Sequence, residues 1–252
     1  MASSGPRATE LLVVGLIPAK LTSRRLPRKN LALLGGVPLV AHAIRTSRLA
    51  RDITETFVST EAEEVAAVAR TEGARVISRE AALSEPAVTN LAVMRQALPA
   101  MVEALGRAPD LIVLLQPTHP FRDPQEIDRG IGAMRSRPDA TSLVTVGRVT
   151  APLGQVVEGW WQNPQALERR AGAPPHGVSA NVGSFYIFRT ALTVAQDIFF
   201  GGRVLAFELA RPEQDVDIDE PWDLEMARAI LERHPELVAG RQPVGMDASR
   251  GS

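Results

Sequence analysis

Short runs of β-branched and aliphatic residues alternate along the chain with longer segments in which apolar residues recur every three or four positions. Such runs are typical of buried strands, and the periodic segments are typical of amphipathic helices. The runs predict strands at residues 11–17, 57–59, 75–78, 111–115, 143–146 and 185–188. The periodic segments predict helices near residues 39–49, 61–72, 89–105 and 221–233. Strands that alternate with helices indicate an α/β fold with a parallel sheet.

The chain is predicted to form one domain over residues 11–235. Its 252 residues are 45% hydrophobic and 23% charged, which is enough for one substantial core without division into several. The ends, 1–10 and 238–252, are polar and contain Gly, Pro and Ser, so we expect flexible tails there. Between residues 150 and 180 the strand and helix pattern is lost, and this segment is a candidate insertion.

Composition excludes several classes of function. The net charge is −1 and no long basic block occurs, so neither a nucleic acid nor an anionic membrane is an expected partner. The absence of cysteine excludes disulfides, thiolate nucleophiles and Cys-ligated metals. The apolar run 11–17 is too short to span a membrane, and residues 1–10 lack the basic start of a signal peptide. We therefore expect a cytoplasmic protein.

The loop at residues 18–30 is the most informative segment, because it follows the first predicted strand and carries five cations. Ligands of open parallel sheets bind at the carboxyl ends of the strands, and this loop lies at such an end. A triphosphate carries about four negative charges and needs cations around it. The alternative is a solvated basic turn, which charge alone does not separate from a phosphate site. The cations are Lys20, Arg24, Arg25, Arg28 and Lys29.

The order of residues in this loop, IPAKLTSRRLPRKN at 17–30, resembles the signature IPAR-x-x-S-K-G-L-P-x-K-N of the acylneuraminate (CMP-sialic acid) cytidylyltransferase family. Further similar segments follow in the family's order from about residue 11 to residue 231, so the resemblance covers nearly the whole chain. They are VSTE at 58–61, Arg79, LLQPTHPFR at 114–122, GSFYI at 183–187, FFGG at 199–202 and VDID at 216–219.

This resemblance implies a Rossmann-like nucleotide-binding sheet of the glycosyltransferase-A type with a small dimerisation insertion. It implies an enzyme that transfers CMP from CTP to a small acidic acceptor and releases pyrophosphate. A homodimer is also implied, with residues 150–180 at its interface. Trp160 and Trp161 are then interface anchors, since exposed aromatic pairs need cover, or alternatively the centre of a local mini-core.

The resemblance also assigns roles within the loop. Lys20, Arg25 and Lys29 take the catalytic, phosphate-binding positions. Lys20 replaces an arginine of the family, which keeps the charge and loses the planar fork. Arg25 stands where sialic-type enzymes have Gly and the related Kdo cytidylyltransferases have Arg, so the loop is intermediate between the two groups. For one nucleotide-binding candidate, Arg79, the alternative is a surface salt bridge. The nucleotide-binding candidates are Ala19, Ser23, Asn30, Ser59 and Arg79.

Asp217 and Asp219 are the candidate metal ligands. They alternate in VDID, which points both carboxylates to one face and leaves the apolar residues for the core. Two such carboxylates repel unless a cation lies between them. Hard oxygen ligands suit Mg²⁺, which would bridge the α- and β-phosphates. The alternative is the acidic start of the last helix, which also contains Glu220 and Asp223.

The resemblance places the acceptor near Gln116, Thr118 and His119. His119 stands where many family members have Ser, and the alternative is a polar loop residue without a role. The family clamps the acceptor carboxylate with two cations, and both are missing from the matching stretches, at Gly154 and Ala180. The acceptor is therefore the least determined part of the prediction. Replacement cations are sought at Arg169 or Arg170, of which Arg170 is the acceptor-site candidate.

Three functions remain open at this point. The first is CMP transfer to a sialic-acid-like (nonulosonic) sugar acid. The second is the same transfer to another anion, such as a phosphonate, or the use of another nucleotide such as GTP. The third is a catalytically silent nucleotide-binding scaffold, which the retained cations and carboxylates disfavour. The sequence contains no P-loop and no Ser/His/Asp motif, so kinase and hydrolase functions have no support.

Overall fold

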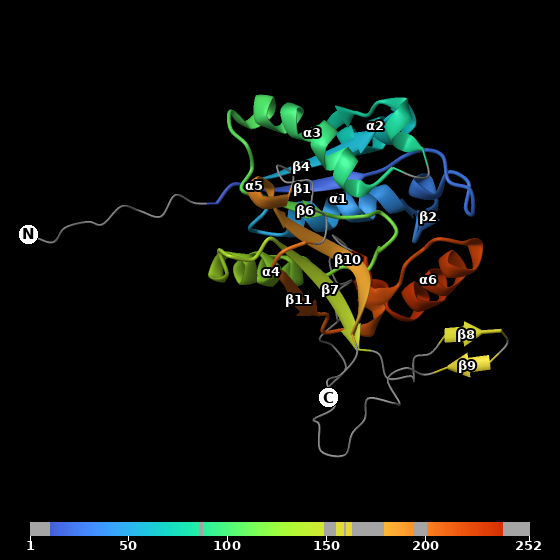
Figure 1. The fold of residues 1–252 in the computed structure, drawn as a ribbon. Helices are drawn as coiled ribbons and strands as arrows, with labels where there is room; N and C mark the ends of the chain where they lie inside the picture. The colour runs from blue at the N-terminus through green and yellow to red at the C-terminus, as the bar shows by residue number, and fades with distance from the viewer. Residues whose placement is uncertain are drawn as a thin grey trace, which may run out of the picture.

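The computed structural model describes residues 11–85, 88–148, 155–158, 160–162, 179–193 and 201–238. Its centre is a seven-stranded sheet with the strand order β11-β7-β10-β6-β1-β4-β5 (Figure 1). The strands are β1 (Val13–Pro18), β4 (Glu55–Thr60), β5 (Arg75–Ser78), β6 (Leu111–Leu114), β7 (Ser142–Arg148), β10 (Ser179–Arg189) and β11 (Val204–Glu208).

Most strand pairs in this sheet are parallel, which confirms the predicted α/β class. β1 pairs in parallel with β4 and β6, β4 with β5, and β7 with β11. β10 departs from the predicted parallel arrangement, because it runs antiparallel to both β6 and β7. The apolar run at 185–188 indicates burial on both faces, and burial carries no information about strand direction.

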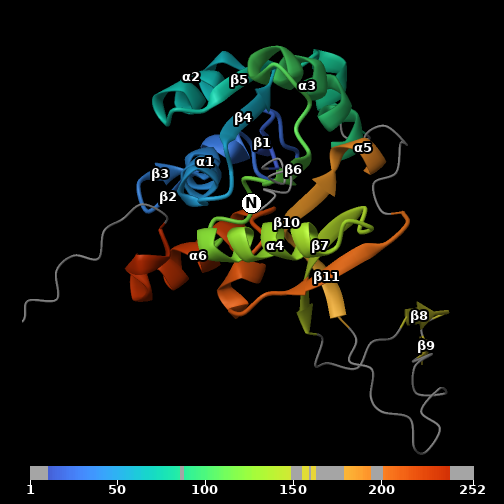
Figure 2. The same ribbon diagram turned by 90° about the vertical axis from the view of Figure 1, so that its left-hand side faces the viewer.

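Helices cover both faces of the sheet, as Figures 1 and 2 show. On one face, α1, α2 and α4 pack against Val13 and Ile17 of β1; on the other, α3 packs against Val14 and Leu16. Alternate residues of β1 thus enter different halves of the core, as the pleat requires. The helices are α1 (Leu39–Leu49), α2 (Glu63–Thr71), α3 (Asn90–Leu105), α4 (Pro124–Ser136), α5 (Thr190–Thr193) and α6 (Pro221–Arg233).

Two small hairpins complete the described structure. The first, β2 (Leu33–Leu34) with β3 (Val37–Pro38), packs beside α6. The second, β8 (Gln155–Val157) with β9 (Trp160–Gln162), falls in the predicted insertion and lies apart from the large sheet in Figures 1 and 2. Most of the predicted insertion lies outside the described residues. Ser179 and Ala180, at the predicted end of the insertion, belong to β10.

None of the helices in the described ranges has the length and apolar character that crossing a bilayer requires.

Candidate active site

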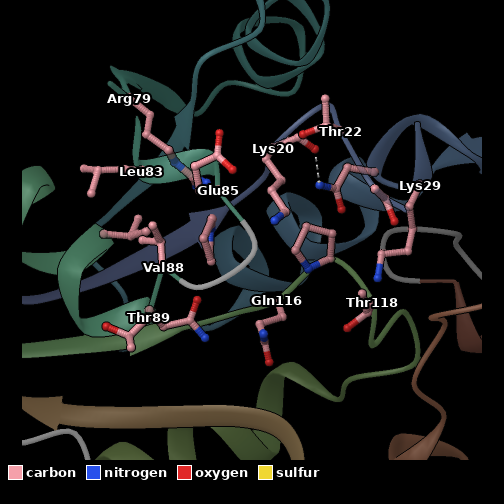
Figure 3. Close-up of a pocket in the computed structure, with 16 residues that line it drawn as sticks. Lys20, Thr22, Lys29, Arg79, Leu83, Glu85, Val88, Thr89, Gln116 and Thr118 are labelled. Atoms are coloured by element: carbon pink, nitrogen blue, oxygen red, sulfur yellow. Dashed lines mark hydrogen bonds between the residues drawn. The ribbon is translucent and has the colours of Figure 1, made fainter. Parts of the chain in front are cut away.

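A cavity of about 390 Å³ opens at the carboxyl ends of three parallel strands of the sheet, β1, β5 and β6 (Figure 3). Pro18 ends β1, Arg79 directly follows β5, and Gln116 lies two residues beyond β6. This edge of the sheet is where ligands of open α/β folds bind. Seven of the residues predicted from sequence line the cavity together, and they are Lys20, Ser23, Lys29, Asn30, Arg79, Gln116 and Thr118.

One end of the cavity is lined by a mixture of charged, polar and apolar side chains, among them Arg79, Leu83, Glu85 and Val88. In Figure 3, Arg79, Leu83 and Val88 lie together, away from Lys29 and Thr118. The Arg79 side chain is buried and donates from Nε to the Ser59 hydroxyl (3.1 Å) and from Nη2 to the Ser59 carbonyl (2.7 Å). Burial lowers the pKa of Arg79, against the nearby charge of Glu61. Arg79 therefore does not form a surface salt bridge, and its guanidinium is positioned by two hydrogen bonds to Ser59.

The opposite end is cationic. Lys29 donates from Nζ to Asp219 Oδ1 at 2.5 Å and exposes 15% of its side chain. Arg25 pairs with the other Asp219 oxygen and lies outside the cavity lining. Burial raises the pKa of Asp219, but the hydrogen bond and charge of Lys29 and the charge of Arg25 outweigh it, so the pKa lies below its usual value. Lys20 reaches across the cavity to the Ser84 carbonyl (3.2 Å). Arg28 pairs with Glu64 on α2 and does not line the cavity.

Backbone contacts fix the shape of the 18–30 loop. Asn30 is buried and donates from Nδ2 to the Lys20 carbonyl (2.7 Å), while the buried Ala19 donates its N–H to the Ser59 carbonyl (3.0 Å). Glu61, which sequence reasoning did not select, accepts from the Leu21 N–H (2.8 Å) and, through its other oxygen, from the Ser84 hydroxyl (2.7 Å). Ala19 and Asn30 thus shape the loop, and Glu61 joins it to the segment on the other side of the cavity.

The VDID segment has the predicted alternation but belongs to no strand. Ile218 is buried, whereas the side chains of Asp217 and Asp219 are 48% and 31% exposed. A single backbone hydrogen bond, from the Ile218 N–H to the Thr118 carbonyl (2.8 Å), holds the segment beside the cavity. The next carboxylates form a capping box at the start of α6, which confirms the helix-start interpretation for Glu220 and Asp223.

Asp217 and Asp219 supply only part of the oxygen ligands that a hard cation such as Mg²⁺ needs. Both oxygens of Asp219 already contact Lys29 and Arg25. Asp217 is half-exposed, and its Oδ1 lies 3.7 Å from His119 Nδ1. Within the described ranges, no group of three or more His, Asp or Glu side chains is placed to hold a metal ion. The two carboxylates therefore fit Mg²⁺ when phosphate oxygens and water complete its six ligands, as is usual for this ion.

His119 and Arg122 lie behind the cavity wall. The His119 side chain is 2% exposed and does not line the cavity. Burial, assisted by the charge of Arg122, lowers the pKa of His119 to about 4. Arg122 is buried and donates to the carbonyls of Gln116 and Ser184. Burial also lowers the pKa of Arg122, to about 9, so the guanidinium remains charged at neutral pH.

Some predicted residues fall elsewhere, and some lining residues were missed. Arg169, Arg170 and Gly154 lie outside the described residues. The start of α3 was missed as part of the site, although Thr89, Asn90 and Val93 line the cavity. Its signal is a Thr in the N-cap position, whose hydroxyl accepts from the Ala92 N–H (3.2 Å).

The mostly parallel sheet, the cavity at the carboxyl ends of its strands and the lysines that line this cavity are typical of a nucleotide-binding α/β enzyme. Residues 14–158 match the family model described as Cytidylyltransferase, so the chain belongs to the cytidylyltransferase family and is a nucleotidyltransferase. This confirms the family resemblance of the motifs.

Curated relatives and solved structures agree with this assignment. The chain is 30% identical over 249 residues to 3-deoxy-manno-octulosonate cytidylyltransferase of Anaeromyxobacter dehalogenans, covering 87% of this chain and 97% of the relative. It is 26% identical to N-acylneuraminate cytidylyltransferase A of Danio rerio, over 90% of this chain and 52% of the relative. The structure of a CMP:2-keto-3-deoxy-manno-octonic acid synthetase complexed with CTP superposes with a TM-score of 0.65 at 18% identity, covering 88% of this chain and 99% of that one.

Proposed function

We propose that this protein transfers CMP from CTP to a sugar acid and releases pyrophosphate. One observation carries the proposal: a single cavity joins an end lined by Arg79, Leu83 and Val88 to a cationic end at Lys29, and Gln116 and Thr118 also line it. The apolar side chains of the first end suit the faces of a base ring, its polar side chains suit the ring edge, and the lysines suit phosphates. The relatives act on 3-deoxy-manno-octulosonate and on N-acylneuraminate, both acids that carry hydroxyl groups.

We assign different residues of the cavity to different parts of this reaction. An acceptor hydroxyl oxygen attacks the α-phosphorus, the new O–P bond forms as the bond to pyrophosphate breaks, and the hydroxyl proton passes to a base or to solvent. Lys20 and Lys29 hold the phosphates and offset the negative charge on the leaving group. Mg²⁺ held by Asp217 and Asp219 together with phosphate oxygens would add further neutralisation of pyrophosphate. Arg79 and Ser59 fix the nucleoside end.

Transfer to a phosphonate is the second candidate. The absence of a cation at Ala180, where the family has a carboxylate clamp, is the observation that favours it. A phosphonate oxygen is already charged and needs positioning more than deprotonation. Gln116 and Thr118 support the sugar acid, because amide and hydroxyl groups bond to hydroxyls.

A pyrophosphate-release assay of the four common nucleoside triphosphates against sugar acids and phosphonates tests the proposal. We expect turnover with CTP and either 3-deoxy-manno-octulosonate or an N-acylneuraminate, at a kcat/KM roughly a hundredfold above that with any phosphonate. The reverse preference would replace the sugar acid as the substrate class, and turnover with GTP in place of CTP would contradict the nucleotide assignment.

We further propose that the enzyme is a homodimer. The β8–β9 hairpin has three residues in each strand and no described pairing with the large sheet. An isolated two-stranded hairpin is marginally stable in water, so it needs a surface to pack on. A second copy of the chain supplies one.

A further inference from the structure

Three groups form a hydrogen-bonded chain behind the cavity wall. Thr118 lines the cavity, and its Oγ1 lies 3.1 Å from His119 Nδ1. The other ring nitrogen, Nε2, lies 2.8 Å from the Val182 carbonyl oxygen. The proposed function above does not use this histidine.

The direction of each hydrogen bond in this chain follows from its ends. A carbonyl oxygen only accepts, so Nε2 carries the hydrogen that it donates to Val182. The imidazole is buried beside the buried guanidinium of Arg122, where a second positive charge is disfavoured, whereas the Asp217 carboxylate, 3.7 Å from Nδ1, is half-exposed and screened by solvent. A neutral ring that donates from Nε2 has Nδ1 as an acceptor. The Thr118 hydroxyl must then donate to Nδ1. Its hydrogen is committed to His119, and only its oxygen lone pairs remain for a ligand in the cavity.

A distortion in the backbone of β10 places the Val182 carbonyl next to His119. The strand register shifts between Asn181 and Tyr186, which marks a bulge. Gly183 within this bulge has φ 73°, and a Cβ there would lie 3.1 Å from the Tyr186 hydroxyl and 3.5 Å from His119 Cε1. The bulge brings β10 close to the imidazole and turns a carbonyl out of the strand ladder toward it.

We infer that His119 is a positioning residue that fixes the Thr118 hydroxyl as an acceptor, so that this point of the cavity selects a hydroxyl group of the substrate. A substrate hydroxyl donates to such an oxygen, whereas a carboxylate or phosphonate oxygen has no hydrogen to donate and is repelled by it. The inference rests on the proposed function and deepens it, because it assigns Thr118 to a hydroxyl of the acceptor rather than to its acid group.

The first test reads the tautomer directly in the wild-type protein. Two-bond ¹⁵N–¹H correlation spectra of the ring show which nitrogen carries the hydrogen. We expect His119, assigned by its loss in His119→Leu, to be the Nε2–H tautomer at neutral pH. A hydrogen on Nδ1 would reverse the polarity of Thr118 and overturn the inference. This measurement uses the free protein, so it does not depend on the identity of the acceptor.

The second test measures acceptor kinetics with CTP saturating, using 3-deoxy-manno-octulosonate and its singly deoxygenated analogues. Thr118→Val keeps the shape and removes the oxygen, and we expect kcat/KM for the full acceptor to fall roughly tenfold. Thr118→Ser should restore it. With the wild type, one of the deoxygenated analogues should have a kcat/KM that is lower than that of the full acceptor by a similar factor. With Thr118→Val, the full acceptor and this analogue should have the same kcat/KM. The KM for CTP should change less than about twofold, which separates acceptor positioning from damage to the nucleotide site.

A double-mutant cycle tests the link to His119. We expect His119→Leu to lower kcat/KM for the acceptor when Thr118 is present and to have no further effect in Thr118→Val. Equal, additive effects, or a Thr118→Val enzyme as active as wild type, would overturn the inference. If the wild type turns over no sugar acid with CTP, the proposed function fails instead, and the tautomer still reports on the polarity of Thr118. Thermal unfolding of each variant confirms that it is folded.

Discussion

Lys29 and Asp219 share one short contact at the cationic end of the cavity, and this contact decides where the lysine charge lies before a nucleotide binds. Lys29 is mostly buried, so its ammonium group has few positions available. An incoming phosphate has to share this ammonium with a carboxylate that is already ionised. The same carboxylate is a proposed ligand of Mg²⁺, so phosphate and metal binding at this end are coupled through Asp219.

Replacing Lys29 with Ala should lower kcat/KM for CTP by a factor of ten to a hundred. A charge-assisted contact to a phosphate at a part-buried site contributes about 1.5–3 kcal/mol. Steady-state pyrophosphate release measures the change. Arg28→Ala is the matched control, because Arg28 belongs to the same loop but pairs with Glu64 outside the cavity. We expect the control to stay within about threefold of wild type, and equal losses in both variants would show that the loop acts only through its total charge.

Asp217→Asn should lower turnover by roughly a hundredfold or more and weaken the apparent affinity for Mg²⁺. The change removes a charge without altering the shape of a half-exposed side chain, so the unfolding temperature should move little. Activity titrated against Mg²⁺ is the measurement, with Asp215→Asn as a control two residues upstream. Near-normal turnover of Asp217→Asn at saturating Mg²⁺ would remove Asp217 from the metal site.

His42 should make the fold less stable in mild acid. It is fully buried in α1, with Nε2 3.0 Å from the Leu34 carbonyl, and burial lowers its pKa below 6.5. The unfolded chain binds a proton near pH 6.5 that the folded protein does not bind. The stability contributed by neutral His42 is therefore complete above pH 6.5 and declines as the pH falls below it. Thermal unfolding from about pH 7.5 to about pH 5 should show a smaller decline for His42→Gln than for wild type. Equal declines would contradict the assignment.

At the scale of the element, the start of α6 links helix stability to the site. Asp223 Oδ2 accepts the backbone N–H groups of Asp219 (2.9 Å) and Glu220 (2.8 Å). Asp223→Ala should cost about 1 kcal/mol of unfolding free energy, or about 2–4 °C in the unfolding temperature. Turnover should also fall, because the Asp219 backbone loses an anchor. Glu225→Ala, on an exposed position of the same helix, is the control for both measurements.

The elements that the sequence predicted well are those with strong periodicity and clear ends. α1 and α6 match their predicted bounds, and Pro221 stands at the first position of α6. α4 was missed, although Asp123 caps it and Pro124 begins it. β11 was missed because it is an edge strand whose residues are only exposed or half-buried, so burial leaves a weak pattern in its sequence.

The residues that line the cavity were predictable from the sequence where loops that follow neighbouring parallel strands meet at one edge of the sheet. They were not predictable where distant backbone contacts position a side chain. The loop after β1 and the segment after β6 meet because parallel strands end on the same side. Arg122, for example, donates a hydrogen bond to the carbonyl of Ser184, 62 residues away along the chain. No local pattern in the sequence reports such a contact, and the same holds for the carbonyl that receives the His119 hydrogen.

At the scale of the whole molecule, β10 joins the sheet to the proposed acceptor site. Its Tyr186–Arg189 segment pairs with β6 in the centre of the sheet, while Ser179–Asn181 pairs with β7. The bulge between these parts places the Val182 carbonyl within hydrogen-bond distance of His119. The strand behind Thr118 is therefore held both by its pairing in the sheet and by the hydrogen bond between Val182 and His119.

The last prediction concerns assembly. Light scattering coupled to size exclusion should give the wild type twice the 27.2 kDa mass of one chain. Trp160→Ser with Trp161→Ser, in β9, should shift the mass toward one chain, because aromatic anchors contribute most to such interfaces. kcat/KM for the acceptor should then fall more than the affinity for CTP, because Val182 of β10 contacts His119 beside Thr118, at the proposed acceptor site. Trp222→Ser, an exposed tryptophan on α6, is the matched control. A wild type of single-chain mass at all concentrations would contradict the homodimer.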